Sequence, residues 1–360
     1  MKVLVSVQHP AHVHFFKHTI QELRNSGHDV RVITRDKEIV VELLQHYGVP
    51  HKTLVQPYDG MWDLVKRQVE YEYRVLKEAV RFAPDVMVSV GSPAVGHAAK
   101  IVRTPYVMFT DNDVLSNYLA VPFADTICTP ENFEKEYGRK HVRYAGYQEL
   151  AYLHPEQFDP DAELLRRNGI EPHDDFFVLR FIDWGAHHDV GQEGLTPEIK
   201  RRLVSMLDQR GEVYITTEAE LREEFEQYRL PIPIHAVHHL LYFANLYVGD
   251  SQTMATEAAL LGTPAIRSNS FVGEGDMENF VELEEKYGLL YSLRDETAVL
   301  EKAEELVSRE KAQQDWEKRK GRLLDEKENV YKTVTDILLK RGEIASGNDT
   351  KSRPSRTRIR

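Results

Sequence analysis

Cysteine is almost absent from this 360-residue sequence, which contains only Cys128. A single cysteine excludes an intrachain disulfide and argues against a cysteine-based metal site. No apolar run approaches the ~20 residues that a membrane-spanning helix needs. The opening segment, Met1–Val7, has the pattern of a strand and not the layout of a signal peptide. We therefore expect a reducing, cytoplasmic location and no metal ion.

Positive charge is also in short supply. The chain has 46 Lys and Arg against 58 Asp and Glu, a net charge of −12 at pH 7, and this excess of negative charge disfavours broad nucleic-acid binding. Residues 341–360 are the exception, with six Lys/Arg and two Asp/Glu. Their polar composition predicts a disordered basic tail. An alternative is weak peripheral contact of this tail with an anionic membrane surface.

Strand and helix patterns alternate through two successive parts of the chain. Buried strands such as Val3–Val7 and Val86–Val90 are each followed by a helical pattern. The alternation pauses at residues 146–155 and resumes with Phe176–Phe181. This order is typical of parallel sheets with crossover helices. It predicts an α/β fold of two Rossmann-like, doubly wound domains, residues 1–150 and 151–340, that face a cleft. Ligands of such sheets bind beyond the carboxyl ends of the strands.

The most informative segment runs from Gly249 to Pro264. It predicts a strand, a short polar turn and a helix of small apolar residues. Backbone N–H groups and the helix dipole at such a turn attract phosphate. We expect Ser251, Gln252 and Thr253 to hold a diphosphate and Glu257 to reach the hydroxyls of the attached ribose. The alternative is an ordinary N-cap followed by a packed helix that ends at Gly262.

Three histidines follow the first strand. His9, His12 and His14 lie at the entry to a helix, and imidazole titrates close to neutral pH, so one of them could be a general base. We prefer His12 for this role and expect His9 and His14 to contact substrate. Alternatively, the histidines cap the helix while Phe15 and Phe16 pack in the core. No carboxylate cluster adjoins them, which disfavours a metal site.

Two further candidates follow later strands of the first part. Ser92 lies in a tight turn after Val86–Val90 and is a candidate for binding substrate. Asp111 follows the strand Tyr106–Phe109, where it could bind acceptor hydroxyls or move a proton. A helix cap is the alternative role for Asp111.

In the second part, the loop that follows the strand Phe176–Phe181 is dense in functional groups. Trp184 could stack on a base or sugar ring, and Arg180 or His187 could meet phosphate. Arg267 follows another strand and would face the same cleft. The candidates for substrate binding in this part that lie outside the Gly249–Pro264 segment are Arg180, Asp183, Trp184, His187, His188 and Arg267.

Together these blocks resemble the GT-B superfamily of nucleotide-sugar enzymes. Within it, the chain is identified as a member of a prokaryotic, mainly archaeal family of unknown function, on residues 9–17, 184–189 and 249–255. The run from Asp250 to Pro264 is also similar to that of UDP-N-acetylglucosamine 2-epimerases and to the donor site of bacterial glycosyltransferases. Gln252 and Thr253 stand where the epimerases have two glycines. The resemblance implies that a C-terminal helix, Lys311–Leu339, returns toward the first domain.

Three functions remain open. The first is a glycosyltransferase that uses a nucleotide-diphosphate sugar as substrate and needs no further cofactor, with His12 or Asp111 as the base. The second is a non-hydrolysing sugar epimerase. The glutamate of the epimerases' Glu-Ala-Gly-Leu-Arg block is missing from residues 110–114, which favours transfer, although Asp111 could replace it. The third is a non-catalytic protein that binds nucleotide sugars. The sequence does not identify the acceptor.

Overall fold

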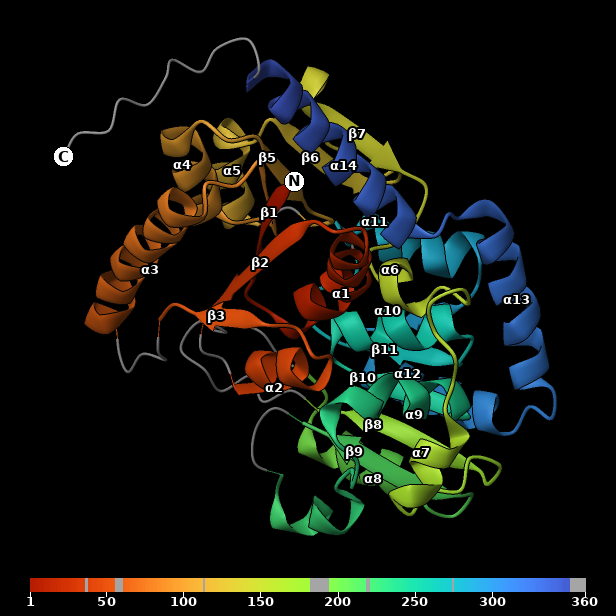
Figure 1. The fold of residues 1–360 in the computed structure, drawn as a ribbon. Helices are drawn as coiled ribbons and strands as arrows, with labels where there is room; N and C mark the ends of the chain where they lie inside the picture. Colours follow the sequence, from red (N-terminus) through yellow and green to blue (C-terminus); the bar gives the residue numbers. More distant parts are fainter. Residues whose placement is uncertain are drawn as a thin grey trace. The chain divides into compact units, whose positions relative to one another are not determined.

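The computed structural model describes residues 1–35, 38–55, 61–112, 114–181, 194–217, 221–273 and 275–349. It divides the chain into two compact units (Figure 1). Unit 1 consists of Met1–Tyr152 and Glu328–Arg360, and unit 2 of Leu153–Lys327. The division therefore falls two residues from the boundary expected from the sequence, and the C-terminal segment belongs to unit 1. Among the described residues, no helix is both long and apolar enough to cross a membrane.

Unit 1 is built on a seven-stranded parallel sheet with the strand order β3-β2-β1-β4-β5-β6-β7. Its central strands are mostly apolar and largely buried, because helices cover both faces of such a sheet. The strands are β1 (Lys2–Val7), β2 (Asp29–Thr34), β3 (His51–Thr53), β4 (Val86–Val90), β5 (Tyr106–Phe109), β6 (Thr126–Pro130) and β7 (His141–Tyr144). The helices are α1 (Pro10–Asn25), α2 (Glu38–His46), α3 (Met61–Phe82), α4 (Pro93–Val102), α5 (Leu115–Ala120), η1 (Val121–Phe123), η2 (Gly138–Lys140), α6 (Leu150–Leu153, at the unit boundary) and α14 (Val330–Asp349).

Unit 2 has a five-stranded parallel sheet with the order β12-β11-β10-β8-β9. The strands are β8 (Phe176–Arg180), β9 (Glu212–Thr216), β10 (Leu246–Gly249), β11 (Ala265–Arg267) and β12 (Leu290–Ser292). The helices are α7 (Ala162–Arg167), α8 (Pro197–Leu207), η3 (Glu223–Tyr228), η4 (Ile234–Ala236), α9 (Val237–Phe243), α10 (Gln252–Leu261), α11 (Glu278–Val281), the π-turn η5 (Glu282–Lys286), α12 (Glu296–Val307) and α13 (Ala312–Glu326).

Helix α14 packs on α1 within unit 1. Val330, Val334 and Leu338 recur every four residues, are fully buried and form one face of α14. The buried hydroxyls of Thr335 and Thr19 lie 3.2 Å apart across this contact. The C-terminal helix therefore completes the core of unit 1.

The expectation of one helix over Lys311–Leu339 is wrong, because the chain forms α13 and α14 with a break between them. Lys327 has an extended backbone with ψ of 144°, and its buried ammonium group is 2.7 Å from the Glu282 carboxylate. Next to it, the Glu328 N–H donates to the Ala145 carbonyl at 2.7 Å. These tertiary contacts end α13 at a position where the sequence has no glycine or proline.

Protonation of His18 should couple acidity to the stability of unit 1. Burial and neighbouring Lys17 lower the pKa of His18 from 6.5 to about 4. As pH falls from 6.5 toward 4, His18 binds a proton in the unfolded chain but not in the folded chain. The free energy of unfolding therefore decreases over that range. We expect the Tm of His18→Gln to fall less than that of the wild type in this interval. Parallel Tm curves would contradict this assignment.

Candidate functional site

The candidate residues of unit 1 meet at the carboxyl edge of its sheet. The strand order turns between β1 and β4, which are direct neighbours, and β5 lies next to β4. The loops after β1 and β4 are joined because Gln8 Nε2 donates to Ser92 Oγ at 3.1 Å. The structure therefore brings the His9–His14 segment, Ser92 and Asp111 to one edge, at a switch point where such sheets bind ligands.

Helix α1 begins at Pro10, so that His12 and His14 lie within its first turns. His9 is the N-cap, and its Nδ1 accepts from the Ala11 N–H at 3.2 Å. His14 is buried, with its ring 5.2 Å from that of Tyr152 and its Nδ1 3.3 Å from the Tyr47 hydroxyl. These contacts give His9 and His14 structural roles, while their contact with substrate stays a prediction.

His12 is half-buried and makes a hydrogen bond that limits its chemistry. Its Nδ1 accepts a long hydrogen bond, 3.4 Å, from the Gln8 N–H. In a neutral imidazole with this contact, the proton resides on Nε2. This tautomer donates a hydrogen bond through Nε2 and cannot accept a proton there. This contact suits His12 as a donor to an oxygen atom, while its role as a base stays a prediction.

The loop that contains Asp111 is held by hydrogen bonds from Asn117. Asn117 Nδ2 donates to Thr110 Oγ1 and to the Asn112 carbonyl, both at 2.7 Å. The Asn117 amide also fills the space beside Gly91, where a Cβ would lie 2.1 Å from its Oδ1. Gly91 has a φ of +48°. A glycine here therefore allows the loops after β4 and β5 to pack together.

Burial raises the pKa of the Asp111 carboxyl to about 6. Buried Tyr144, at the end of β7, has a pKa raised well above its usual value by burial and then by the charges of Asp111, Cys128 and Glu149. Glu149 is itself only 8% exposed. Both carboxylates thus raise the pKa of this phenol, and the pKa of the Asp111 carboxyl is itself raised toward neutral pH. No motif or residue spacing in the sequence points to Tyr144 or Glu149.

In unit 2, the predicted phosphate turn lies at the carboxyl end of β10. Ser251 is the N-cap of α10, and its Oγ accepts from the Met254 N–H at 3.4 Å. Gly262 ends the helix with a φ of +87°. The N-cap at Ser251 and the helix end at Gly262, as expected from the sequence, are therefore both present. Gln252 and Thr253, in the first turn, are half-buried. The phosphate role of Ser251, Gln252 and Thr253 stays a prediction.

Glu257 is held by a buried histidine on a neighbouring helix. His238 Nε2 on α9 lies 2.9 Å from Glu257 Oε1, and both side chains are 6% exposed. His238 therefore fixes one carboxylate oxygen of Glu257. This pairing orients the Glu257 carboxylate that would bind a ribose. In the sequence, the pairing is indicated by nothing more than the presence of a histidine at position 238.

Arg180 reaches the same edge as Ser251. It pairs in register with Gly249 across β8 and β10, and its Nη1 donates to Thr216 Oγ1 at 3.1 Å. Its side chain is largely buried, at 8% exposure. The candidates Asp183, Trp184, His187 and His188 lie outside the described residues.

Arg267 forms the buried centre of a different contact. Its guanidinium has no exposed surface, pairs with Asp276, donates to Ser292 Oγ at 3.2 Å and lies 3.6 Å from the ring centre of Phe280. Burial lowers its pKa, while Asp276 opposes that shift. Arg267 thus anchors the loop that follows β11, and its contact with substrate stays a prediction.

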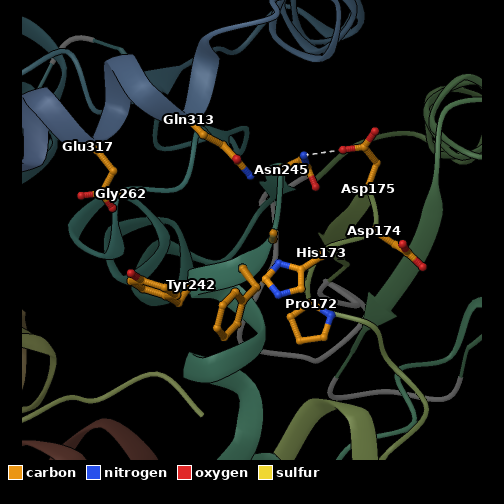
Figure 2. A pocket seen from close by; sticks show the side chains of 11 residues that line it. Pro172, His173, Asp174, Asp175, Tyr242, Asn245, Gly262, Gln313 and Glu317 are labelled. Atoms are coloured by element: carbon orange, nitrogen blue, oxygen red, sulfur yellow. Dashed lines mark hydrogen bonds between the residues drawn. The ribbon is translucent and has the colours of Figure 1, made fainter. Parts of the chain in front are cut away.

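A hollow of about 300 Å³ opens at the opposite edge of this sheet (Figure 2). Asp175 and Asn245 line it and precede β8 and β10, and the Asn245 amide donates to Asp175 at 2.8 Å. This position at the amino ends of the strands separates it from Ser251. Among the described residues, no group of three or more His, Cys, Asp or Glu could hold a metal ion.

The comparisons with known proteins agree with this architecture. Residues 1–327 match the model of the family described as "Protein of unknown function (DUF354)", and the chain belongs to this family. It is 23% identical to "Uncharacterized protein MJ0665" of Methanocaldococcus jannaschii over 74% of this chain and 81% of that protein.

Two solved structures show the same fold at low identity. The UDP-GlcNAc 2-epimerase from Neisseria meningitidis bound to UDP-GlcNAc has a TM-score of 0.63 at 12% identity, covering 95% of this chain and 99% of that one. Spinosyn forosaminyltransferase SpnP has a TM-score of 0.62 at 14% identity, covering 96% and 99%. The predictions of the family and of two GT-B-type parallel α/β sheets are confirmed.

Removal of the Arg267 guanidinium should destabilise unit 2. Arg267→Met leaves the Asp276 carboxylate, 8% exposed, without its counter-charge, and such a loss costs about 3–5 kcal/mol. Urea unfolding would measure the change. The exposed arginine in Arg294→Met is the matched control and should unfold like the wild type. Equal stability of the two variants would contradict an anchoring role for Arg267.

Proposed function

We propose that this protein is a glycosyltransferase that takes a nucleotide-diphosphate sugar as donor. One observation carries the proposal: the N-terminus of α10, Arg180 and the oriented carboxylate of Glu257 share the carboxyl edge of one sheet. A helix N-terminus and an arginine suit a diphosphate, and a fixed carboxylate suits a pair of hydroxyls. The named ligand of the N. meningitidis structure supports a nucleotide sugar as the class of ligand.

Within this proposal, unit 1 supplies the groups that act on the acceptor hydroxyl. Asp111 is the base, because its carboxyl has a pKa of about 6 and is ionised at neutral pH. His12 donates a hydrogen bond through Nε2 to an oxygen of the acceptor. This division of roles replaces the preference for His12 as base that the sequence alone suggested.

A sugar epimerase is the second candidate, and the surroundings of Tyr144 favour it. Epimerisation by removal and return of a proton needs an acid and a base. Asp111 and Glu149 both raise the pKa of the Tyr144 phenol, so these three groups are candidates for the two roles. The N. meningitidis epimerase with the same fold supports this alternative. Calorimetric screening of nucleotide sugars, followed by NMR with the tightest binder, separates the two. Turnover without an acceptor indicates epimerisation, and turnover that requires an acceptor indicates transfer.

Glu257 should contribute to nucleotide binding. We expect Glu257→Ala to weaken UDP binding by about 1–3 kcal/mol, the usual loss when a charged hydrogen-bond partner is removed. Glu257→Gln keeps an acceptor for His238 and for a hydroxyl, so it should lose less. Titration calorimetry measures both, with exposed Glu301→Ala on α12 as the matched control. Unchanged affinity of a folded Glu257→Ala variant would reduce Glu257 to a packing role.

Asp111 should control the pH dependence of turnover. Because its pKa is about 6, the rate should rise as pH increases through that value and the carboxyl ionises. Asp111→Asn should lower turnover by roughly 10²–10⁴-fold and remove this rise. His12→Asn should lower turnover but keep the rise, and His46→Asn serves as the control histidine. If His12→Asn instead abolishes the rise, the imidazole is the base and the assignment to Asp111 is wrong.

A further inference from the structure

Helix α3 carries an apolar stripe on the side that faces away from its own core. Tyr71, Val75 and Phe82 are its buried face. On the other side, Val69, Tyr73 and Val80 are each more than 60% exposed, at 65%, 62% and 62%. Such a row of large apolar groups is unusual on a solvated helix and marks an interaction surface.

The spacing of this stripe is that of a coiled-coil seam. Val69, Tyr73, Leu76 and Val80 follow one another at intervals of four, three and four residues, which is the alternation of d and a positions in a heptad. Leu76 is partly buried against the core cluster of unit 1 and lies between the exposed members. The stripe therefore has the form that a second helix of the same spacing would cover.

One flank of the stripe is already occupied within unit 1. Helix α4 lies beside α3 (Figure 1), and His97 of α4 contacts the Glu72 carboxylate at 3.0 Å. The other flank presents Glu70 and exposed Lys77, which are the e positions of this heptad. Glu70 pairs with Arg67 and Arg74 on its own helix.

We propose that α3 is the contact through which two copies of this chain form a two-fold dimer, with their α3 helices antiparallel. In this arrangement Val69 opposes Val80 of the second copy, and Tyr73 opposes Leu76. In the part of unit 1 that the structure describes, α4 packs against the other flank and leaves the e flank for the second copy, and antiparallel pairing places e positions against e positions. Glu70 of each copy then meets Lys77 of the other, so the symmetry produces two complementary charge pairs. A parallel pairing would direct Lys77 to the flank that α4 occupies.

The first test measures the mass of the full-length protein by light scattering and sedimentation across a range of concentration. We expect a dimer for the wild type, and a monomer with unchanged circular dichroism and Tm for Val80→Glu. Val281→Glu on α11, at an apolar site 41% exposed, is the matched control and should remain a dimer. A monomeric wild type, or a dimeric Val80→Glu variant, would overturn the proposal.

The second test addresses the partner and the orientation. Glu70→Lys and Lys77→Glu should each weaken the dimer, because each places like charges opposite one another. Mixing the two variants restores both charge pairs, so heterodimers should form at least ten-fold more tightly than either homodimer. The double variant Glu70→Lys/Lys77→Glu should dimerise like the wild type. If mixing gives no preference for heterodimers, antiparallel pairing of α3 is wrong.

Discussion

The parallel register of the two sheets is the constraint on which the candidate site depends. In a parallel sheet every strand delivers its following loop to the same edge, so residues far apart in sequence become neighbours. In unit 1 this brings together the segments after β1, β4 and β5, which contain His12, Ser92 and Asp111. The sheets can be parallel only because their central strands are apolar on both faces and are covered by helices. The chemistry at the edge thus follows from the hydrophobicity of the strands.

At these edges, buried polar groups serve mainly to hold other groups in place. Asn117 fixes the loop before Asp111, His238 fixes Glu257, and Arg267 fixes the loop after β11. A buried charge is costly unless a partner compensates it, so each pair imposes one geometry on its loop. Reactive groups need this support because a catalytic group that is displaced by an ångström loses much of its effect.

The sequence predicted the architecture well because apolar periodicity determines which segments are central strands. The edge strands β3, β7 and β12 carry no such signal because they are short, and β3 and β7 also include His51, Lys52 and Arg143, which are not typical of buried strands. The break at Lys327 was missed because tertiary contacts with Glu282 and Ala145 create it, and no local residue marks it. The location of the described candidates next to the carboxyl ends of strands could be predicted, whereas their partners could not. Histidines at 12, 14 and 238 look alike in sequence, yet one is half-buried and two are buried with fixed neighbours.

These partners also decide which chemistry each candidate can perform. A histidine whose Nδ1 accepts from the backbone is a poor base at Nε2, whereas a carboxyl with a raised pKa remains ionised at neutral pH and is more basic than a solvated one. The contacts of Arg267 also limit what it can bind. Its guanidinium is paired with Asp276 and fully buried, so it has no exposed surface for a diphosphate. Arg180, at the end of β8 next to β10, is 8% exposed and donates to the hydroxyl of Thr216. Of the two arginines, Arg180 is therefore the one that the proposed anionic donor would contact.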